Sequence, residues 1–227
     1  MIPVLDVKAG IEAENDIYAE EVRRFLKERN VFLVNLMASP GAGKTTLLSR
    51  VIDDLAGELE IGVIEADVDA DVDAQTVAAH GARAVQVHTG GSCHMDARMT
   101  LTGLKGFGGD IPKVVFLENV GNLVCPAEFD VGANLRLMLL SVPEGDDKPL
   151  KYPLMFTVSD ALAITKTDTA PAFDFNVEAC TAHVRALGNQ MPVFPLSVKT
   201  GEGWGPFIEW LKAVLKQDPC TAEGGTA

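Results

Sequence analysis

A short glycine-rich segment between an apolar run and a helical pattern constrains this sequence more than any other feature. Residues 31–37 are almost wholly apolar, which is typical of a strand buried on both faces of a parallel sheet. The next residues are Ala38-Ser39-Pro40-Gly41-Ala42-Gly43-Lys44-Thr45. They match the phosphate-binding loop, with Ala38 where glycine is commonest. Such a loop turns its backbone N–H groups toward phosphate, and the following helix presents its positive end to the same anion.

The residues of this loop have separate expected roles. Gly41 and Gly43 let the backbone curl around the phosphates, and Lys44 reaches the β- and γ-phosphates. Thr45 offers its hydroxyl to Mg²⁺. Two further residues expected to contact the nucleotide are Ala42 and Thr46.

Strands and helices alternate along the rest of the chain. Further apolar runs predict strands at residues 61–64, 84–88, 113–117, 161–164 and 193–196, and helical patterns lie at residues 15–29, 46–55, 175–187 and 206–216. The alternation predicts an α/β fold with three layers and a doubly wound, mostly parallel sheet, as in P-loop NTPases. Ligands of such folds bind at the carboxyl ends of the strands, so polar clusters after strands are expected to converge there. We expect one domain over residues 1–217, beginning with a helical segment at 1–30, and a disordered tail at 218–227.

Composition and charge limit the class of partner. The 227 residues are 47% hydrophobic, which suffices for a full core, and their net charge is −13. This acidity disfavours nucleic acid and anionic membranes, which both attract basic proteins. The sequence predicts no membrane span and no signal peptide. Four widely spaced cysteines in a chain of this size are typical of reduced thiols, so we expect a cytoplasmic location.

Two motifs after later strands favour GTP over ATP. Thr165-Lys166-Thr167-Asp168 is similar to the Asn/Thr-Lys-x-Asp motif of GTP-binding proteins. The Asp168 carboxylate can accept hydrogen bonds from both the ring N–H and the amine of guanine, which adenine cannot offer, and Lys166 can lie over the base. Ser197-Val198-Lys199 is similar to the Ser-Ala-Lys loop that supports the guanine carbonyl. A plain polar loop is the alternative for each motif, but their order after successive strands favours a guanine site.

Carboxylates that follow two of the strands are candidates for Mg²⁺ and for the attacking water. The segment at 65–73 alternates acidic and small residues but lacks the turn glycine of an EF-hand. We expect Asp67 to orient the water and Asp71 to act as a switch residue that senses Mg²⁺, although a solvated loop is the alternative. Glu118 and Gly121 fit the Asp-x-x-Gly switch with Glu in place of Asp. Glu118 would hold Mg²⁺ through a water, and the Gly121 N–H would meet the γ-phosphate.

Two thiols and an imidazole are candidates for a soft-metal site. Cys93, His94 and Cys125 are the right ligand types for Zn²⁺ or Ni²⁺. The sequence has no Cys-x-x-Cys, so buried apolar cysteines are the alternative. Both cysteines follow strands at the same sheet edge, which favours the metal. Three ligands would leave a coordination position open, as suits a transfer site or a site shared between two chains.

Longer motifs indicate a known family. The most specific stretch, residues 118–127, reads Glu-Asn-Val-Gly-Asn-Leu-Val-Cys-Pro-Ala, and the others are Cys-His-Met-Asp-Ala at 93–97 and Lys-Tyr-Pro-Leu-Met-Phe at 151–156. Over residues 15–212 the chain resembles the HypB family, the nickel-incorporation GTPases of nickel–iron hydrogenase maturation, in the SIMIBI class. The resemblance implies a GTPase that dimerises with GTP and holds metal at the dimer interface through Cys93, His94 and Cys125. It also implies nickel transfer to the hydrogenase large subunit with a HypA-type partner.

Departures from the family pattern narrow the expected role. Some members carry an N-terminal Cys-x-x-Cys-Gly-Cys site or a histidine-rich tract, whereas the first cysteine here is Cys93, which disfavours nickel storage. We identify no catalytic glutamine or arginine finger, so we expect slow conversion of GTP and water to GDP and phosphate. The alternatives are a urease-type nickel-maturation GTPase, a P-loop kinase with Asp67 as base, and a metal-binding protein with a vestigial nucleotide site. The urease-type role is disfavoured by the Asn-Leu-Val-Cys-Pro stretch, and the kinase by the Thr-Lys-x-Asp motif. The vestigial nucleotide site is disfavoured because Lys44 and Thr45 are intact.

Overall fold

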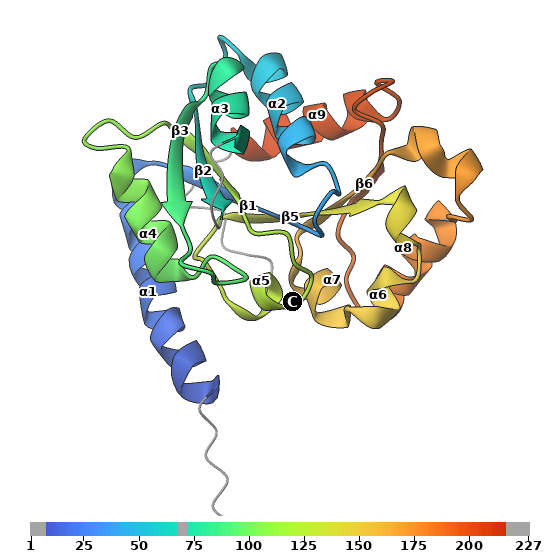
Figure 1. The fold of residues 1–227 in the computed structure, drawn as a ribbon, viewed down its shortest axis with the longest axis horizontal. Coiled ribbons are helices and arrows are strands. Elements are labelled where there is room, and N and C mark those ends of the chain that lie inside the picture. Colours follow the sequence, from blue (N-terminus) through green and yellow to red (C-terminus); the bar gives the residue numbers. More distant parts are fainter. Residues whose placement is uncertain (1–7, 68–71, 217–227) are drawn as a thin grey trace, which may run out of the picture.

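A parallel sheet forms the centre of the molecule. The computed structural model describes residues 8–67 and 72–216. Its strands are β1 (Phe32–Ala38), β2 (Ile61–Asp67), β3 (Arg83–His88), β4 (Val114–Glu118), β5 (Leu135–Ser141), β6 (Ala161–Thr165) and β7 (Val193–Pro195). They lie in the order β3-β2-β4-β1-β5-β6-β7, and every described pairing is parallel (Figure 1).

Helices cover both faces of this sheet. They are α1 (Lys8–Arg29), α2 (Lys44–Leu55), α3 (Val72–Ala79), α4 (Ala97–Gly106), α5 (Cys125–Glu128), α6 (Lys148–Lys151), α7 (Pro153–Val158), α8 (Val177–Ala186) and α9 (Trp204–Leu215), with 3₁₀ turns η1 (Val142–Glu144) and η2 (Thr167–Ala172). Helices α2, α3 and α9 pack on one face, and α1, α4, α7 and α8 on the other. The predicted three-layer, doubly wound P-loop NTPase fold is therefore confirmed.

Alternation along β1 explains why this strand lies in the middle. Phe32, Val34 and Leu36 pack with the α2 and α9 layer, while Leu33 contacts the α1 and α4 layer, and all are fully or almost fully buried. A strand buried on both faces requires the near-continuous apolar run found in the sequence. Its carboxyl end therefore carries the glycine-rich loop to the centre of the sheet edge.

Two sequence predictions about elements were wrong. Strand β5 lies between β1 and β6 and was not predicted. The acidic segment was expected to form a loop, but β2 continues through Glu65 to Asp67, and α3 begins at Val72 before Asp73. The predicted tail at 218–227 lies outside the described residues. Among the residues described, no helix combines the length and apolar character that a membrane crossing requires.

Candidate nucleotide and metal sites

The glycine-rich loop joins β1 to α2 in a conformation that only glycine adopts easily. Gly41 has φ 75° and Gly43 has φ 98°, both in the left-handed region. Gly43 is also the N-cap of α2, and it makes no side-chain cap hydrogen bond. The first N–H groups of α2 therefore point out of the helix without an intrahelical acceptor, which is the arrangement that binds phosphate.

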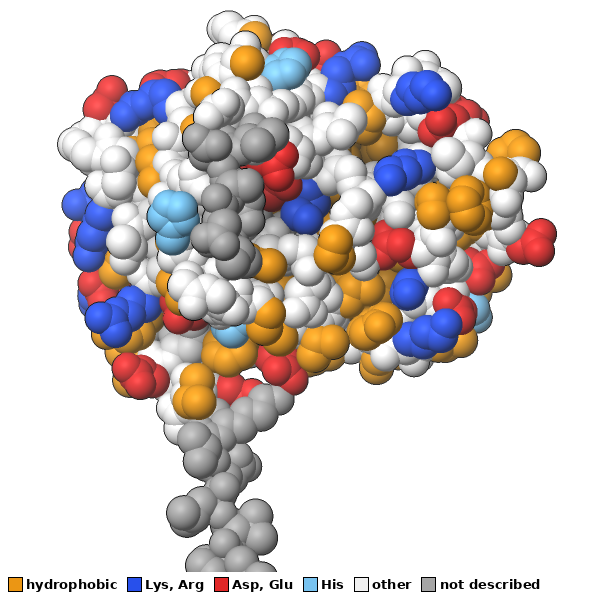
Figure 2. All heavy atoms as spheres, viewed as in Figure 1, with side chains coloured by type: hydrophobic (Ala, Val, Ile, Leu, Met, Phe, Trp, Pro, Cys, Tyr) orange, Lys and Arg blue, Asp and Glu red, His pale blue; other side chains and the backbone are white. Residues whose placement is uncertain are grey.

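A cavity of about 620 Å³ opens in front of this loop. Its predicted nucleotide residues are Gly41, Gly43, Lys44, Thr45, Thr46, Glu118, Gly121 and Lys166, and Glu65, Asp73, Asn119 and Val120 also line it. Figure 2 shows acidic and basic side chains close together near the middle of this face. The cavity gathers cationic and carboxylate groups beside free backbone donors, so it suits an anion that is accompanied by a metal ion.

Two buried carboxyl groups face the Thr45 hydroxyl. Thr45 Oγ1 donates a hydrogen bond to Glu118 Oε1 at 2.9 Å, and Glu65 is the register partner of Glu118 on β2. Both glutamates are 4% exposed, and Glu65 Oε1 and Glu118 Oε2 have no hydrogen-bond partner. Burial, and then the neighbouring Glu118, raise the pKa of Glu65 to about 9. Burial also raises the pKa of Glu118 to about 6, and the charge of Lys44 opposes this rise.

These oxygen atoms fit Mg²⁺. A hydroxyl and a carboxylate with a free oxygen are hard donors, and a cation would relieve the cost of burying two acids side by side. The sequence predicts Glu118 at this site but gives no role to Glu65, because the apolar run that predicts the strand stops at residue 64. Asp67 ends β2, and Asp71 lies outside the described residues, so their expected contacts with water and Mg²⁺ stay predictions.

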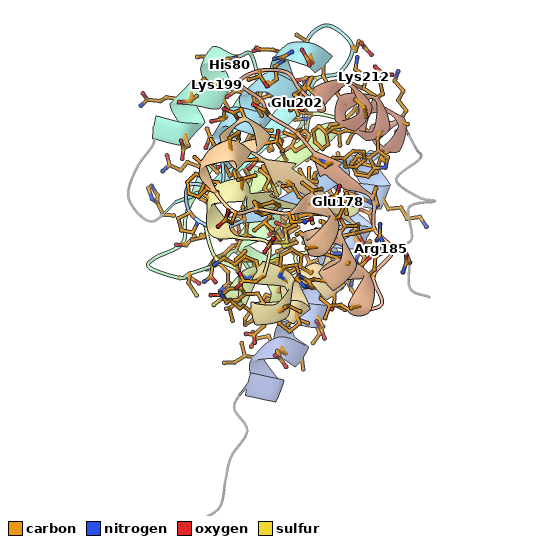
Figure 3. All side chains as sticks on the ribbon, turned by 90° about the vertical axis from the view of Figure 1, so that its right-hand side faces the viewer. His80, Glu178, Arg185, Lys199, Glu202 and Lys212 are labelled. Atoms are coloured by element: carbon orange, nitrogen blue, oxygen red, sulfur yellow. The ribbon has the colours of Figure 1, made fainter. Side chains whose placement is uncertain are left out.

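The two guanine motifs meet beside the phosphate loop. Thr165 Oγ1 donates to the Ala42 carbonyl at 2.7 Å, and Lys166 Nζ donates to the Gly41 carbonyl at 2.6 Å. Asp168 Oδ1 accepts from Ser197 Oγ at 2.8 Å. Val198 packs against the core. Lys199 is an exposed residue of the turn after β7 (Figure 3).

Cys93, His94 and Cys125 come together although they are distant in sequence. Their candidate ligand atoms all lie within 4.8 Å of one another, and the two Sγ atoms are 2.8 Å apart. The His94 ring stacks on Phe129 with 4.1 Å between centroids. Burial lowers the pKa of His94, which favours the neutral imidazole that binds metals. The side-chain hydrogen bond shared with Cys93 raises the pKa of the Cys125 thiol. Two sulfur donors and one nitrogen donor fit Zn²⁺ or Ni²⁺.

The segment between β4 and α5 contacts both sites. A Cβ on Gly121 would lie 2.8 Å from Pro40 N, and the Asn122 N–H donates to the Ala38 carbonyl at 2.9 Å, so this segment touches the phosphate loop. Asn119 is buried, and its Oδ1 accepts from Met95 N at 3.0 Å, next to His94. The same segment ends at Cys125. The polar clusters thus form a nucleotide cavity and an adjoining cluster of soft ligands, which this segment connects.

The comparisons with known proteins decide the family. A family model described as "CobW/HypB/UreG, nucleotide-binding domain" matches residues 32–195. The hydrogenase maturation factor HypB of Rhizobium leguminosarum bv. viciae is 43% identical over 209 residues, covering 92% of this chain and 70% of that protein. This chain belongs to the HypB family.

Other HypB proteins are similar in sequence and in structure. The hydrogenase/urease maturation factor HypB of Helicobacter hepaticus is 41% identical over 202 residues, covering 87% of this chain and 83% of that protein. The crystal structure of HypB from Helicobacter pylori in complex with nickel has a TM-score of 0.83 and 36% identity, and the match covers 89% of this chain and 95% of that chain. The fold and most of this chain are therefore shared with HypB.

Proposed function

We propose that this HypB-family chain is a cytoplasmic, GTP-hydrolysing metallochaperone. It would bind Ni²⁺ or Zn²⁺ and assist nickel insertion into a nickel–iron hydrogenase, together with a HypA-type chaperone and the hydrogenase large subunit. One observation carries the proposal: the segment from Glu118 to Cys125 lines the phosphate cavity at one end and supplies a soft-metal ligand at the other. A ligand-bearing loop that also contacts the nucleotide loop can report the state of the phosphates to the metal.

Hydrolysis would proceed by in-line attack of water on the γ-phosphate of GTP. Lys44 and the N–H groups of the loop would stabilise the charge that develops on the phosphate oxygens. Thr45 and Glu118 would hold Mg²⁺, which when bound neutralises charge on the β- and γ-phosphates. Asp67 would orient the water, and Asp71 would respond to the cation. Turnover would be slow, because neither a catalytic glutamine nor an arginine finger is identified.

Guanine selection would depend on Asp168. The hydrogen bond from Ser197 occupies Oδ1 of this carboxylate and fixes its orientation, and the second oxygen can accept from the guanine edge. Thr165 and Lys166 contact the phosphate loop directly, so the base site and the phosphate site would be held in fixed register. GDP would therefore share the base contacts and lack those to the γ-phosphate.

Nickel would be cargo rather than a resident cofactor. The three soft ligands leave at least one coordination position for a donor from another molecule, and Cys93 is exposed. The similar HypB of Helicobacter pylori was crystallised in complex with nickel, which supports the choice of metal. An exposed, incomplete ligand set suits transfer better than storage.

The proposal is tested by separating the two sites. Lys44→Ala is expected to lower GTP turnover by about 100-fold or more, since it removes the cation that stabilises the γ-phosphate. Cys125→Ala is expected to weaken Ni²⁺ binding by at least about tenfold and to leave GDP affinity nearly unchanged. Steady-state phosphate release and equilibrium dialysis measure the two effects. Fast turnover without a partner, or normal Ni²⁺ uptake by Cys125→Ala, would contradict the proposal.

A urease-type role is the second candidate. The relative from Helicobacter hepaticus is named for both hydrogenase and urease maturation, which keeps this alternative open. The two roles differ in the acceptor of nickel. Incubation of the nickel-loaded, GTP-bound protein with metal-free hydrogenase large subunit or with metal-free urease separates them. Nickel transfer to urease alone would favour the second candidate.

A further inference from the structure

Helix α1 holds together the two loops that carry the soft-metal ligands. Asn15 of α1 is 7% exposed, and its Oδ1 accepts from Ala97 N at 3.0 Å. Its Nδ2 donates to the Asp130 carbonyl at 2.8 Å. Ala97 closes the loop that contains Cys93 and His94, and Asp130 follows the short helix that starts at Cys125. One buried amide therefore connects the backbones that follow the ligands on both sides of the site.

Other contacts fix the second loop against the same helix. Arg23 Nη1 of α1 donates to Asp130 Oδ2 at 2.8 Å. A Cβ on Gly132 would lie 2.6 Å from the Ala19 carbonyl, so the loop packs directly on the α1 backbone. Phe129, the residue before Asp130, stacks on the His94 ring. A shift of α1 would therefore be passed on to the His94 imidazole through Asp130 and Phe129. Figure 1 shows α1 alongside α4, the helix that follows the Cys93 loop.

We propose that Asn15 is a positioning residue for the soft-metal site. This inference rests on the proposed function, because it assumes that Cys93, His94 and Cys125 bind a metal. Groups behind the ligands orient them, and loss of such a group typically weakens metal binding. Asn15 satisfies a buried N–H at the start of α4 and a carbonyl after α5. Asn119 also links the two ligand-bearing segments, since its Oδ1 accepts from Met95 N, but Asn15 ties both of them to α1. Without Asn15 the two loops lose their common anchor on α1, and the spacing between His94 and Cys125 relaxes.

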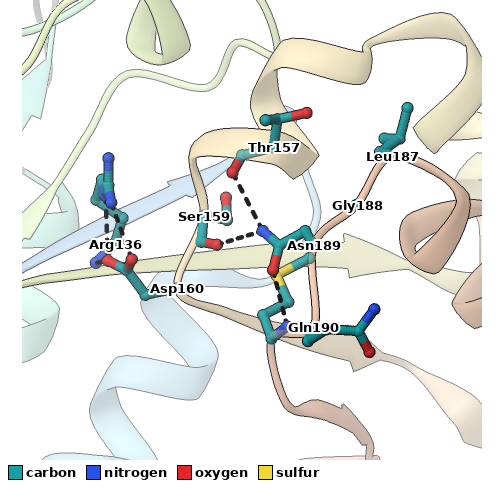
Figure 4. A pocket seen from close by; sticks show the side chains of 9 residues that line it. Arg136, Thr157, Ser159, Asp160, Leu187, Gly188, Asn189 and Gln190 are labelled. Carbon is teal, nitrogen blue, oxygen red and sulfur yellow. Dashed lines mark hydrogen bonds and ion pairs between the residues drawn. The ribbon is translucent and has the colours of Figure 1, made fainter. Parts of the chain in front are cut away.

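A purely structural role for Asn15 would affect folding and leave metal affinity unchanged, so a matched control is needed. Asn189 provides it. Its Nδ2 donates to the carbonyls of Phe156, Thr157 and Ser159 at 2.9, 3.1 and 2.8 Å. Figure 4 shows this amide in a pocket with the ion pair of Arg136 and Asp160, near the starts of β5 and β6 and at the edge of the sheet opposite the phosphate loop. Asn189 is therefore also an amide that links backbone segments, but its hydrogen bonds reach neither of the loops that carry the metal ligands.

The experiment compares the whole chain with Asn15→Ala and Asn189→Ala, all loaded with GDP. Equilibrium dialysis gives the Ni²⁺ affinity, and Co²⁺ substitution gives the thiolate-to-metal charge-transfer bands. Asn15→Ala is expected to bind Ni²⁺ about 10- to 100-fold more weakly and to have altered Co²⁺ bands, with GDP affinity unchanged. Asn189→Ala is expected to bind Ni²⁺ and Co²⁺ like the wild type, whatever its thermal stability.

Several outcomes would overturn the inference. Equal Ni²⁺ affinity in Asn15→Ala and wild type, or equal weakening in both variants, would reduce Asn15 to a structural residue. If Asn15→Ala does not fold, Arg23→Gln replaces it, because Arg23 is half exposed and its loss removes the ion pair with Asp130 and a local ion pair with Glu20 on the same helix. Unchanged Ni²⁺ affinity in Arg23→Gln would then overturn the inference, and weakened affinity would support it. Absence of Ni²⁺ binding by the wild type would instead overturn the proposed metal site itself.

Discussion

At the scale of single residues, we expect Asp168 to select the base. Its carboxylate accepts from Ser197 and has a second oxygen free for the guanine edge. Asp168→Asn replaces an acceptor by a donor, so it would repel the guanine N–H groups and pair with the carbonyl of xanthine. We expect the preference to shift from GTP to xanthosine triphosphate in a competition assay. Asp174→Asn, an exposed change on the same connection, is the control and should keep GTP preference. Unchanged GTP affinity in Asp168→Asn would remove this residue from the base site.

Glu65 makes the stability of the metal-free protein depend on pH. Its pKa of about 9 lies above the ordinary value of 4.5, so the folded state holds a proton that the unfolded state releases between these pH values. The contribution of Glu65 to the free energy of unfolding is therefore complete below about pH 4.5. It is lost as pH rises toward 9, by at most about 1.4 kcal/mol per pH unit. Glu118, whose pKa is about 6, acts in the same direction over a narrower window, from about pH 4.5 to about pH 6.

Removing the Glu65 charge should flatten this dependence. Glu65→Gln stays neutral at every pH, so its unfolding free energy should change by about 1–3 kcal/mol less than that of the wild type between pH 6.5 and 8.5. Urea unfolding of nucleotide-free, chelator-treated protein measures the difference. The same pH slope in both proteins would mean that Glu65 is ionised in the folded state.

At the scale of elements, the segment from Glu118 to Cys125, here called the switch segment, contacts the phosphate loop. This contact allows a test of whether the switch segment takes part in hydrolysis. A Cβ on Gly121 would lie 2.8 Å from Pro40 N and 2.9 Å from its Cα, and backbone atoms cannot move aside cheaply. Gly121→Ala should displace the switch from the γ-phosphate and slow single-turnover hydrolysis by about tenfold or more, with GDP affinity less affected. Gly109→Ala is the control, because a Cβ there meets no atom within 4 Å. A normal rate in Gly121→Ala would show that the Gly121 N–H is not used.

Some elements of the fold could be predicted from sequence patterns and others could not. The phosphate loop and the motifs at Thr165 and Ser197 are local, so their residues could be predicted with their neighbours. Strand β5 could not, because Arg136 breaks its apolar run and Leu and Met also favour helix. The charge of Arg136 is tolerated there because its guanidinium binds Asp160 through two hydrogen bonds at 2.9 and 3.1 Å. Asp160 is distant from Arg136 in the sequence, so β5 forms as a strand because of a tertiary contact that the local pattern does not show.

The residues of the candidate sites also differ in whether the sequence alone could predict them. The residue types of Cys93, His94 and Cys125 indicated a metal, but only the fold brings them within 4.8 Å. Charged residues usually lie on the surface, so the sequence pattern predicts that the strand ends before Glu65. Glu65 instead belongs to a strand that delivers it, buried, to the cavity beside Glu118. The sequence indicates Asn15 only as the start of a helical pattern and not as a link between the two loops, because its partners Ala97 and Asp130 are reached only after the sheet has formed.

At the scale of the whole molecule, the candidate metal site lies at an exposed and partly apolar edge. Val124, Leu150 and Leu154 are 48%, 57% and 46% exposed, and Val124 adjoins the ligand Cys125. Figure 2 shows hydrophobic side chains gathered on this side of the molecule, over α5 and α7. Apolar surface next to an incomplete ligand set suits a site that a second protein chain completes. The switch segment joins this edge to the phosphate cavity, so the nucleotide should control the association.

We therefore expect a dimer that depends on GTP and changes metal affinity. Light scattering should give a monomer with GDP and a dimer with a non-hydrolysable GTP analogue, and Ni²⁺ affinity should differ between the two states by about tenfold, equivalent to about 1.4 kcal/mol of coupling. Lys44→Ala is the control and should stay monomeric with both nucleotides, because it cannot hold the γ-phosphate. A wild-type monomer in both states that binds no Ni²⁺ or Zn²⁺ would leave a GTPase without cargo. A GTP-dependent dimer whose Ni²⁺ affinity is the same with GDP and with the GTP analogue would show that association does not control metal release. The nucleotide would then control only which partner is bound.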